Sequence, residues 1–153
     1  MRFLYVADAF IGNINFTITF DFLGMKSFCK LKSDINFRGK DALLKIEQLP
    51  MKRRLLGFTI DDQTVDLNGG EIIYKDGLKI VGYIKRSGFG YTVNKHIGYG
   101  YVEIEESERI CSTKNTVEKL MKSNYEIEIM GKRVVAEPFI KALYDSKRQK
   151  IFV

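Results

Sequence analysis

The chain has 153 residues, of which 45% are hydrophobic and 29% are charged, a composition typical of one globular domain rather than of a disordered segment. The formal net charge is +6 and the pI is about 9.2, which favours anionic partners in general without choosing among them. The apolar runs are too short to span a membrane as a helix, and the start, with one early arginine and an interrupting Asp8, is a poor match to a secretory signal or a transit peptide. We therefore expect no membrane partner.

The residue types that usually bind metals are too few and too scattered to predict a metal site. The chain has one histidine, His96, and two cysteines, Cys29 and Cys111, which are far apart and form no C-x-x-C motif. Acidic pairs at 61–62 and 105–106 are typical of solvated turns, and the acids at 126 and 128 alternate with isoleucines, as on the outer face of a strand. These patterns predict no catalytic residue and no metal ligand.

Residues 1–35 form a leader that is rich in phenylalanine. Six of the eleven phenylalanines lie within the first 28 residues, and the stretch Ile14 to Phe22 alternates strictly between apolar and polar side chains. This period predicts a half-buried strand, which would promote aggregation if it were exposed alone. The strand could pair with the body of the domain, belong to a truncated upstream domain, or be part of a poorly defined leader.

Residues 36–50 are predicted to contain a helix, over about 38–48, that links the leader to the following domain. Asp34 and Asn36 are suitable capping residues, and Pro50 ends the helical pattern. The apolar residues at helical spacing are Ala42, Leu43, Ile46 and Leu49.

From residue 51 to residue 153 the pattern is that of short strands separated by closely spaced turns. It predicts strands over 54–60, 71–84 as a hairpin around Asp76-Gly77, 96–104, and a pair over 125–139 that turns near Met130-Gly131. A polar loop is expected over 107–116, followed by one or two helical turns. The predicted fold class is mainly β: a small antiparallel β-barrel preceded by a short helix and an N-terminal strand.

The stretch RSGFGYTV, Arg86 to Val93, has two interpretations. Its glycines and aromatics resemble an RNA-binding signature whose aromatic side chains stack on bases, although the matching upstream signature, LYVAD at 4–8, lies too far away. Alternatively, strand glycines mark bulges or the close approach of another backbone. The glycines in question are Gly82, Gly88, Gly90, Gly98 and Gly100. We favour the structural interpretation and keep RNA binding as a minor alternative.

Five motifs follow one another in order from residue 37 onwards. They are FRGKDALL at 37–44, KRRLLGFTI at 52–60, GGEIIYKDGLKIVGYI at 69–84, KHIGYGYV at 95–102, and YEIEIMGKRVVAEPF at 125–139 followed by LYDSKRQK. Together they resemble the C-terminal part of the folate-binding aminomethyltransferase family, which includes the glycine-cleavage T-protein and the folate regions of sarcosine and dimethylglycine dehydrogenases. The T-protein usually has Ser-Gly-x-x-Ser-Pro-Thr where this chain has SGFGYTV, so the dehydrogenase branch is the more similar one.

The resemblance implies a barrel that closes over tetrahydrofolate held in a central channel. Tyr144 matches a tyrosine of the family that contacts folate, and Arg54, or alternatively Arg53, matches a basic residue where the barrel begins. In the family the catalytic aspartate and most folate contacts lie upstream, and FAD is bound only by the flavin domain that lies earlier still. We therefore expect a C-terminal folate-binding-type region of a sarcosine/dimethylglycine dehydrogenase-like protein of one-carbon metabolism, inactive as the isolated chain.

The resemblance also implies a location in the mitochondrial matrix, with folate or the rest of the dehydrogenase as partner. A non-enzymatic regulatory or interaction module on the same barrel, similar to the regulatory subunit of pyruvate dehydrogenase phosphatase, is the main alternative. Nucleic acid is the least favoured partner. The pattern predicts neither the amine substrate nor the oligomeric state.

Overall fold

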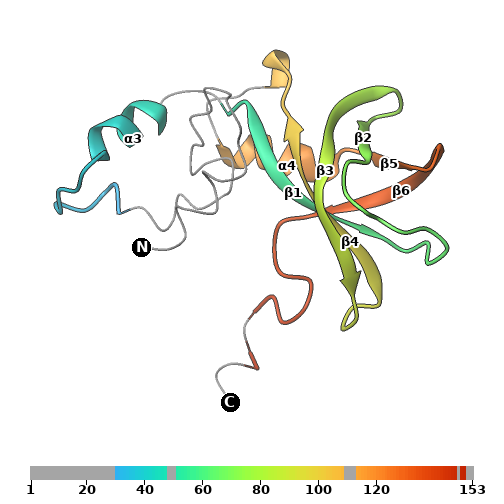
Figure 1. The fold of residues 1–153 in the computed structure, drawn as a ribbon. Helices are drawn as coiled ribbons and strands as arrows, with labels where there is room; N and C mark the ends of the chain where they lie inside the picture. Colours follow the sequence, from blue (N-terminus) through green and yellow to red (C-terminus); the bar gives the residue numbers. More distant parts are fainter. Residues whose placement is uncertain (1–29, 48–50, 109–112, 148, 151–153) are drawn as a thin grey trace.

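The computed structural model describes residues 30–47, 51–108, 113–147 and 149–150. Within these residues six strands form a closed barrel in the order β1-β4-β3-β2-β5-β6, with every neighbouring pair antiparallel (Figure 1). The strands are β1 (Arg53–Ile60), β2 (Ile72–Lys75), β3 (Lys79–Gly90), β4 (Lys95–Glu103), β5 (Tyr125–Ile129) and β6 (Lys132–Phe139). The predicted fold class is confirmed, while the strand expected within 14–22 lies outside the described residues.

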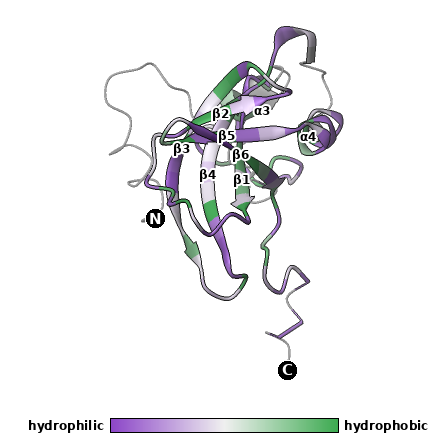
Figure 2. Ribbon diagram, turned by 90° about the vertical axis from the view of Figure 1, so that its right-hand side faces the viewer, coloured by the Kyte–Doolittle hydropathy of each residue, from purple (hydrophilic) through white to green (hydrophobic). Residues whose placement is uncertain are grey.

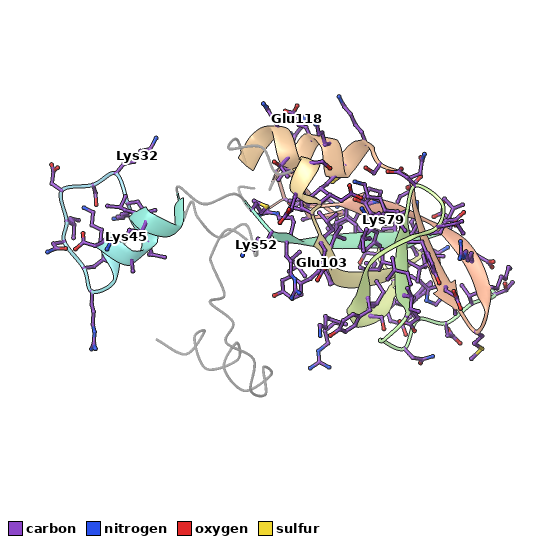
Figure 3. The ribbon with its side chains drawn as sticks, turned by 90° about the horizontal axis from the view of Figure 1, so that it is seen from above. Lys32, Lys45, Lys52, Lys79, Glu103 and Glu118 are labelled. Atoms are coloured by element: carbon purple, nitrogen blue, oxygen red, sulfur yellow. The ribbon has the colours of Figure 1, made fainter. Side chains whose placement is uncertain are left out.

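Two α-helices accompany the barrel in the described part of the chain, with a short 3-10 turn, Glu106–Glu108, between β4 and the second of them. The helix α3 (Lys40–Glu47) lies within the predicted range and stands apart from the barrel in Figures 1 and 3. The helix α4 (Thr113–Lys122) begins earlier than expected, inside the segment that the sequence predicted to be a loop. The reason is that Thr116 and Leu120, one turn apart, are both only 1% exposed. A short stripe thus packs on the barrel although the segment is mostly polar.

The hairpin turns are formed by residues that tolerate a positive φ. Asp76 and Gly77 have φ of 48° and 103° at the end of the β2–β3 hairpin, as the Asp-Gly pair predicts. Met130 and Gly131, with φ of 49° and 78°, connect β5 to β6 at the predicted position. These tight connections fix the register of the strands on both sides.

The barrel interior is filled by side chains. Along β1 the alternate residues Leu56, Phe58 and Ile60 are completely buried, and the ring of Phe58 meets that of Tyr125 edge to face at 5.2 Å. The other strands and α4 contribute the rest of the core, including Ile73, Val81, Ile84, Val102, Leu120, Ile127, Ile129, Val134 and Ala136. The barrel is therefore a packed core and not a container for a ligand.

Glycines permit two of the closest backbone contacts inside the barrel. A Cβ added at Gly82 would lie 2.0 Å from the carbonyl oxygen of Tyr101, and one at Gly100 would lie 2.7 Å from that of Tyr83. No side chain fits at such distances, so these positions require glycine. The structural interpretation of the glycines is confirmed here, whereas a Cβ at Gly88 would meet nothing within 4 Å.

Candidate functional site

The two arginines at the start of β1 have opposite environments because successive residues of a strand point to opposite faces. Arg54 is 8% exposed and lies on the inward face with Leu56, opposite Val102 of β4. Arg53 points outward, and its guanidinium donates a 2.6 Å hydrogen bond to the Glu103 carboxylate on β4. The family-matched residue Arg54 is thus built into the barrel, whereas Arg53 forms an ion pair on its surface.

Other polar side chains are also buried, and the sequence did not single them out. Lys75, the last residue of β2 and the register partner of Tyr125, is 5% exposed, and Thr116 of α4 is 1% exposed. The signal for Lys75 was its place directly after the apolar run Ile72 to Tyr74. Since burying a charge is costly without compensating contacts, these residues belong to the fold's own polar interior.

The tail that follows β6 extends away from the barrel in Figures 1 and 2, and Tyr144 belongs to this tail by its position in the chain. Its side chain is half exposed, its ring centroid lies 4.5 Å from the Nζ of Lys150, and its hydroxyl contacts the same amine. Asp145, with φ of 47°, accepts hydrogen bonds from the backbone N–H groups of Gln149 and Lys150 at 2.8 and 3.1 Å. The two family-matched residues therefore have different settings: Arg54 lies inside the barrel and Tyr144 on a locally folded tail.

Glu126 and Glu128 take part in a contact between the β2–β3 hairpin and the β5–β6 hairpin. The hydroxyl of Tyr74 donates to Glu128 at 2.7 Å, and this carboxylate raises the pKa of the Tyr74 phenol. The Arg133 guanidinium lies 3.8 Å from the centre of the Tyr74 ring, donates to the carbonyl oxygen of Gly77 at 3.0 Å, and lies 3.8 Å from Glu126. The predicted outer-face position of both acids is confirmed, and their contacts are structural.

The acidic pair Asp61-Asp62 lies just after β1 and is also held by neighbours. Lys95 lies 2.7 Å from Asp61, and Lys132 lies 3.1 Å from Asp62. Asp62 also accepts hydrogen bonds from the hydroxyl and the backbone N–H of Thr64, and these bonds, followed by the Lys132 contact, lower its pKa to about 2. These contacts fix the turn that follows β1.

The segment RSGFGYTV continues β3 to Gly90 and then turns into β4. The ring of Phe89 packs edge to face against Tyr91 at 5.3 Å and against His96 at 5.0 Å, so it makes aromatic contacts within the fold. His96 is 7% exposed, which confirms that it is a packing residue. A closed barrel also differs from the open sheet on which the RNA-binding signature presents its aromatics.

The part of the chain that the structure describes contains no group of three or more histidine, cysteine or acidic residues that could hold a metal ion. Its helices are also too short or too polar to cross a membrane.

Comparison with known proteins gives matches to proteins that are much longer than this chain. Mitochondrial sarcosine dehydrogenase of Mus musculus is 30% identical over 128 residues, which are 84% of this chain but 13% of that protein. The mitochondrial pyruvate dehydrogenase phosphatase regulatory subunit of Mus musculus is 33% identical over 134 residues, covering 83% of this chain and 15% of that protein. The aminomethyltransferase of Clostridium botulinum (strain Kyoto / Type A2) is 33% identical over 131 residues, covering 86% and 32%.

Among solved structures, the glycine cleavage system aminomethyltransferase T from Bartonella henselae is similar, with a TM-score of 0.48 and 19% sequence identity over 65% of this chain and 24% of that chain. The chain thus spans between about an eighth and a third of the length of the relatives named above. A family model described as the glycine cleavage T-protein C-terminal barrel domain matches residues 53–145, which include all six strands. By its closed barrel and by this match, the chain belongs to the glycine cleavage T-protein C-terminal barrel family.

Proposed function

We propose that the chain is the C-terminal folate-binding-type region of a sarcosine/dimethylglycine dehydrogenase-like protein of one-carbon metabolism, located in the mitochondrial matrix. The observation that carries the proposal is the match of 84% of this chain to a small part of mitochondrial sarcosine dehydrogenase. The names of several other relatives, including the mitochondrial dimethylglycine dehydrogenases, agree with the location and the branch.

The packing of the barrel determines how such a region would work. Because the interior is filled by residues such as Leu56, Phe58 and Ile127, a folate cannot lie inside the barrel. It would bind outside, between the barrel and the protein that precedes it in the longer relatives. In this proposal the isolated chain supplies one wall of the site, binds tetrahydrofolate weakly or not at all, and does not catalyse the demethylating reaction, while FAD binds only to the upstream region.

Tyr144 and Arg54 are the folate contacts of this proposal. Tyr144 is half exposed, so its ring and hydroxyl can meet a ligand that lies against the tail. Arg54 lies one residue from the start of β1 and would offer its guanidinium to a folate carboxylate that reaches this end of the strand. Its burial also gives it a structural role, which a binding experiment must separate from a ligand contact.

Calorimetric titration with tetrahydrofolate tests the proposal. The full chain is titrated alone and together with the upstream region of mouse sarcosine dehydrogenase, cut where the matching barrel begins. We expect binding only in the combined sample and a weaker affinity for Tyr144→Ala, while Tyr91→Ala, an exposed tyrosine in the β3–β4 turn, serves as the matched control. Micromolar binding by the chain alone would contradict the incomplete-site proposal, and no binding in either sample would contradict the folate function.

A second candidate is a non-enzymatic regulatory or interaction module on the same barrel. It is favoured by the 33% identity to the pyruvate dehydrogenase phosphatase regulatory subunit over 134 residues. This candidate predicts association with a protein partner that tetrahydrofolate neither requires nor strengthens. The same titration therefore separates the two candidates.

A further inference from the structure

The outer surface of the barrel carries an apolar row across four neighbouring strands. The register places Leu55 of β1 opposite Tyr101 of β4, Tyr101 opposite Tyr83 of β3, and Tyr83 opposite Ile72 of β2. These residues point away from the core because their strand neighbours, such as Leu56 and Val102, point into it. A barrel surface that faces water usually carries polar side chains at such positions.

A second pair of aromatic side chains extends this row. Tyr99 of β4 and Phe139 at the end of β6 lie on either side of Gly57 in the register, and their rings meet edge to face at 5.6 Å. The Phe139 ring lies over Gly57, where an added Cβ would be 2.3 Å from it. We call this set the aromatic face. Its members are Leu55, Ile72, Tyr83, Tyr99, Tyr101 and Phe139.

The aromatic face is partly accessible in the described structure. Tyr83 is 50% exposed and Tyr99 is 43% exposed, and partial burial raises the pKa of the Tyr101 phenol. By contrast, the outward positions of β5 and β6 include Glu126, Glu128 and Arg133, which are engaged in the charged contacts around Tyr74. The barrel thus has one aromatic wall and one charged wall, and tyrosine is a residue type enriched at the centres of protein interfaces.

The rim of the aromatic face indicates what would cover it. The Nζ of Lys85 on β3 lies 4.0 Å from the centre of the Tyr83 ring. At the other edge the charge of Arg53 is balanced by Glu103. Lys85 therefore places a positive charge at the β3 side of the rim, which fits a partner with carboxylates there. A second copy of the chain is less suitable because it would bring a second positive rim. RNA bases would stack on free ring faces, and Lys85 on Tyr83 and the edge-to-face pair Tyr99–Phe139 partly occupy these faces.

We propose that the aromatic face is the docking surface of the barrel for a protein surface that is apolar at its centre and acidic at its edge, supplied by the region that precedes the barrel in sarcosine-dehydrogenase-like proteins. The identity of the partner rests on the proposed function. The location of the docking surface rests on the register, the exposure and the charges of this chain.

Hydroxyl-radical footprinting tests the surface without any substitution. The full 153-residue chain is labelled alone and together with the upstream region of mouse sarcosine dehydrogenase whose folding has been checked by circular dichroism. We expect the labelling of Tyr83 and Tyr99 to fall several-fold in the mixture. Tyr91 at 87% exposure and Met130 at 94% exposure lie away from the aromatic face and should be labelled equally in both samples.

Paired substitutions then test the energetics by sedimentation velocity and calorimetry. Tyr83→Ser and Tyr99→Ser should each weaken the complex at least about tenfold, as expected for residues near the centre of an interface. Val135→Ser on β6, which is 72% exposed on the other wall, should bind as the wild type does. Lys85→Glu should slow association more than Lys122→Glu on α4, with a loss that shrinks at high salt.

Three outcomes would overturn the proposal: no complex with the wild-type chain, equal labelling of Tyr83 and Tyr99 in both samples, or equal affinities for the Tyr83 and Val135 variants. Concentration-dependent dimerisation of the chain alone that Tyr83→Ser abolishes would assign the face to a second copy. RNA binding lost in the same variant would assign it to nucleic acid. A complex that forms through this face without binding tetrahydrofolate would keep the docking surface and reject the folate function.

Discussion

Replacement of Gly100 by alanine should destabilise the barrel far more than the same replacement at Gly88. A Cβ at Gly100 would lie 2.6 Å from the Cδ1 of Ile73 and 2.7 Å from the backbone carbonyl oxygen of Tyr83. The isoleucine can change rotamer, but the carbonyl belongs to the neighbouring strand of a closed barrel and cannot retreat without breaking the β3–β4 ladder. At Gly88, on the same pair of strands, the added methyl group meets nothing within 4 Å.

The magnitude follows from two opposing effects. Overpacking of a core typically costs about 1–3 kcal/mol, and the contact with a fixed backbone atom puts Gly100→Ala towards the upper end. Alanine also stabilises by about 0.4–1 kcal/mol because it restricts the unfolded chain, and this effect acts alone at Gly88. The expected net loss for Gly100→Ala is about 2 kcal/mol, or a fall of about 8–16 °C in Tm for a barrel domain of roughly 100 residues that unfolds as one unit.

Thermal and urea unfolding of the wild type and both variants, followed by circular dichroism, measure this difference. We expect a lower midpoint for Gly100→Ala and an unchanged or higher midpoint for Gly88→Ala. Equal midpoints for the two variants would refute the reasoning, because they would mean that β3 and β4 do not approach each other at Gly100 as the structure shows.

Three further predictions concern side chains. Asp62→Asn should flatten the fall of Tm between about pH 4 and pH 2. The pKa of Asp62 is lowered to about 2 in the folded protein, so its ionised form stabilises the fold above the ordinary pKa of 3.8, and this stabilisation is lost as the pH drops through the folded value. Tm measured against pH for both proteins tests this, and parallel curves would contradict it. Arg53→Gln should lower the free energy of unfolding by less than about 1 kcal/mol, as for other exposed ion pairs. Arg54→Gln should lower it clearly more because Arg54 is buried. Similar losses for the two variants in urea unfolding would argue against the interior position of Arg54. Tyr74→Phe should lower Tm because it leaves Glu128 without the 2.7 Å hydrogen bond. The loss should vanish in a Glu128→Ala background, which offers the hydroxyl no acceptor, if that bond is its cause.

The fold was largely predictable because its signals are local. The residue types of Asp76-Gly77 and Met130-Gly131 predict turns, and the alternation of apolar and acidic residues along β5 indicates which side chains face the core. The helix α4 was placed too late because only Thr116 and Leu120 among its described side chains are deeply buried, and that burial depends on the barrel against which they pack. A contact between distant segments leaves no local pattern.

The candidate site was less predictable for the same reason. Nothing in the dipeptide Arg53-Arg54 shows which arginine points inward until the phase of β1 is fixed by its pairing with β4. The stacking of Arg133 on Tyr74 joins residues on two separate hairpins. The aromatic face did leave a signal, since Gly98-Tyr99-Gly100-Tyr101 alternates glycine with tyrosine, but the sequence did not show that the glycines face the crowded interior and the tyrosines the outside.

The glycine–tyrosine alternation on β4 connects the packing of this barrel to its function. Small residues at 98 and 100 let the side chains of Ile73 and Ile84 fill the interior, with the added Cβ positions lying 2.6 and 3.0 Å from them. A filled interior holds no ligand, so any binding takes place on the outside of the barrel or at its ends. Of the two outer walls, the one around Tyr74 already uses its charges within the chain, while the one around Tyr83 and Tyr99 leaves aromatic surface exposed. In our proposal the barrel is covered on the β1–β4–β3 side, so a test of its function must include the surface that would cover it.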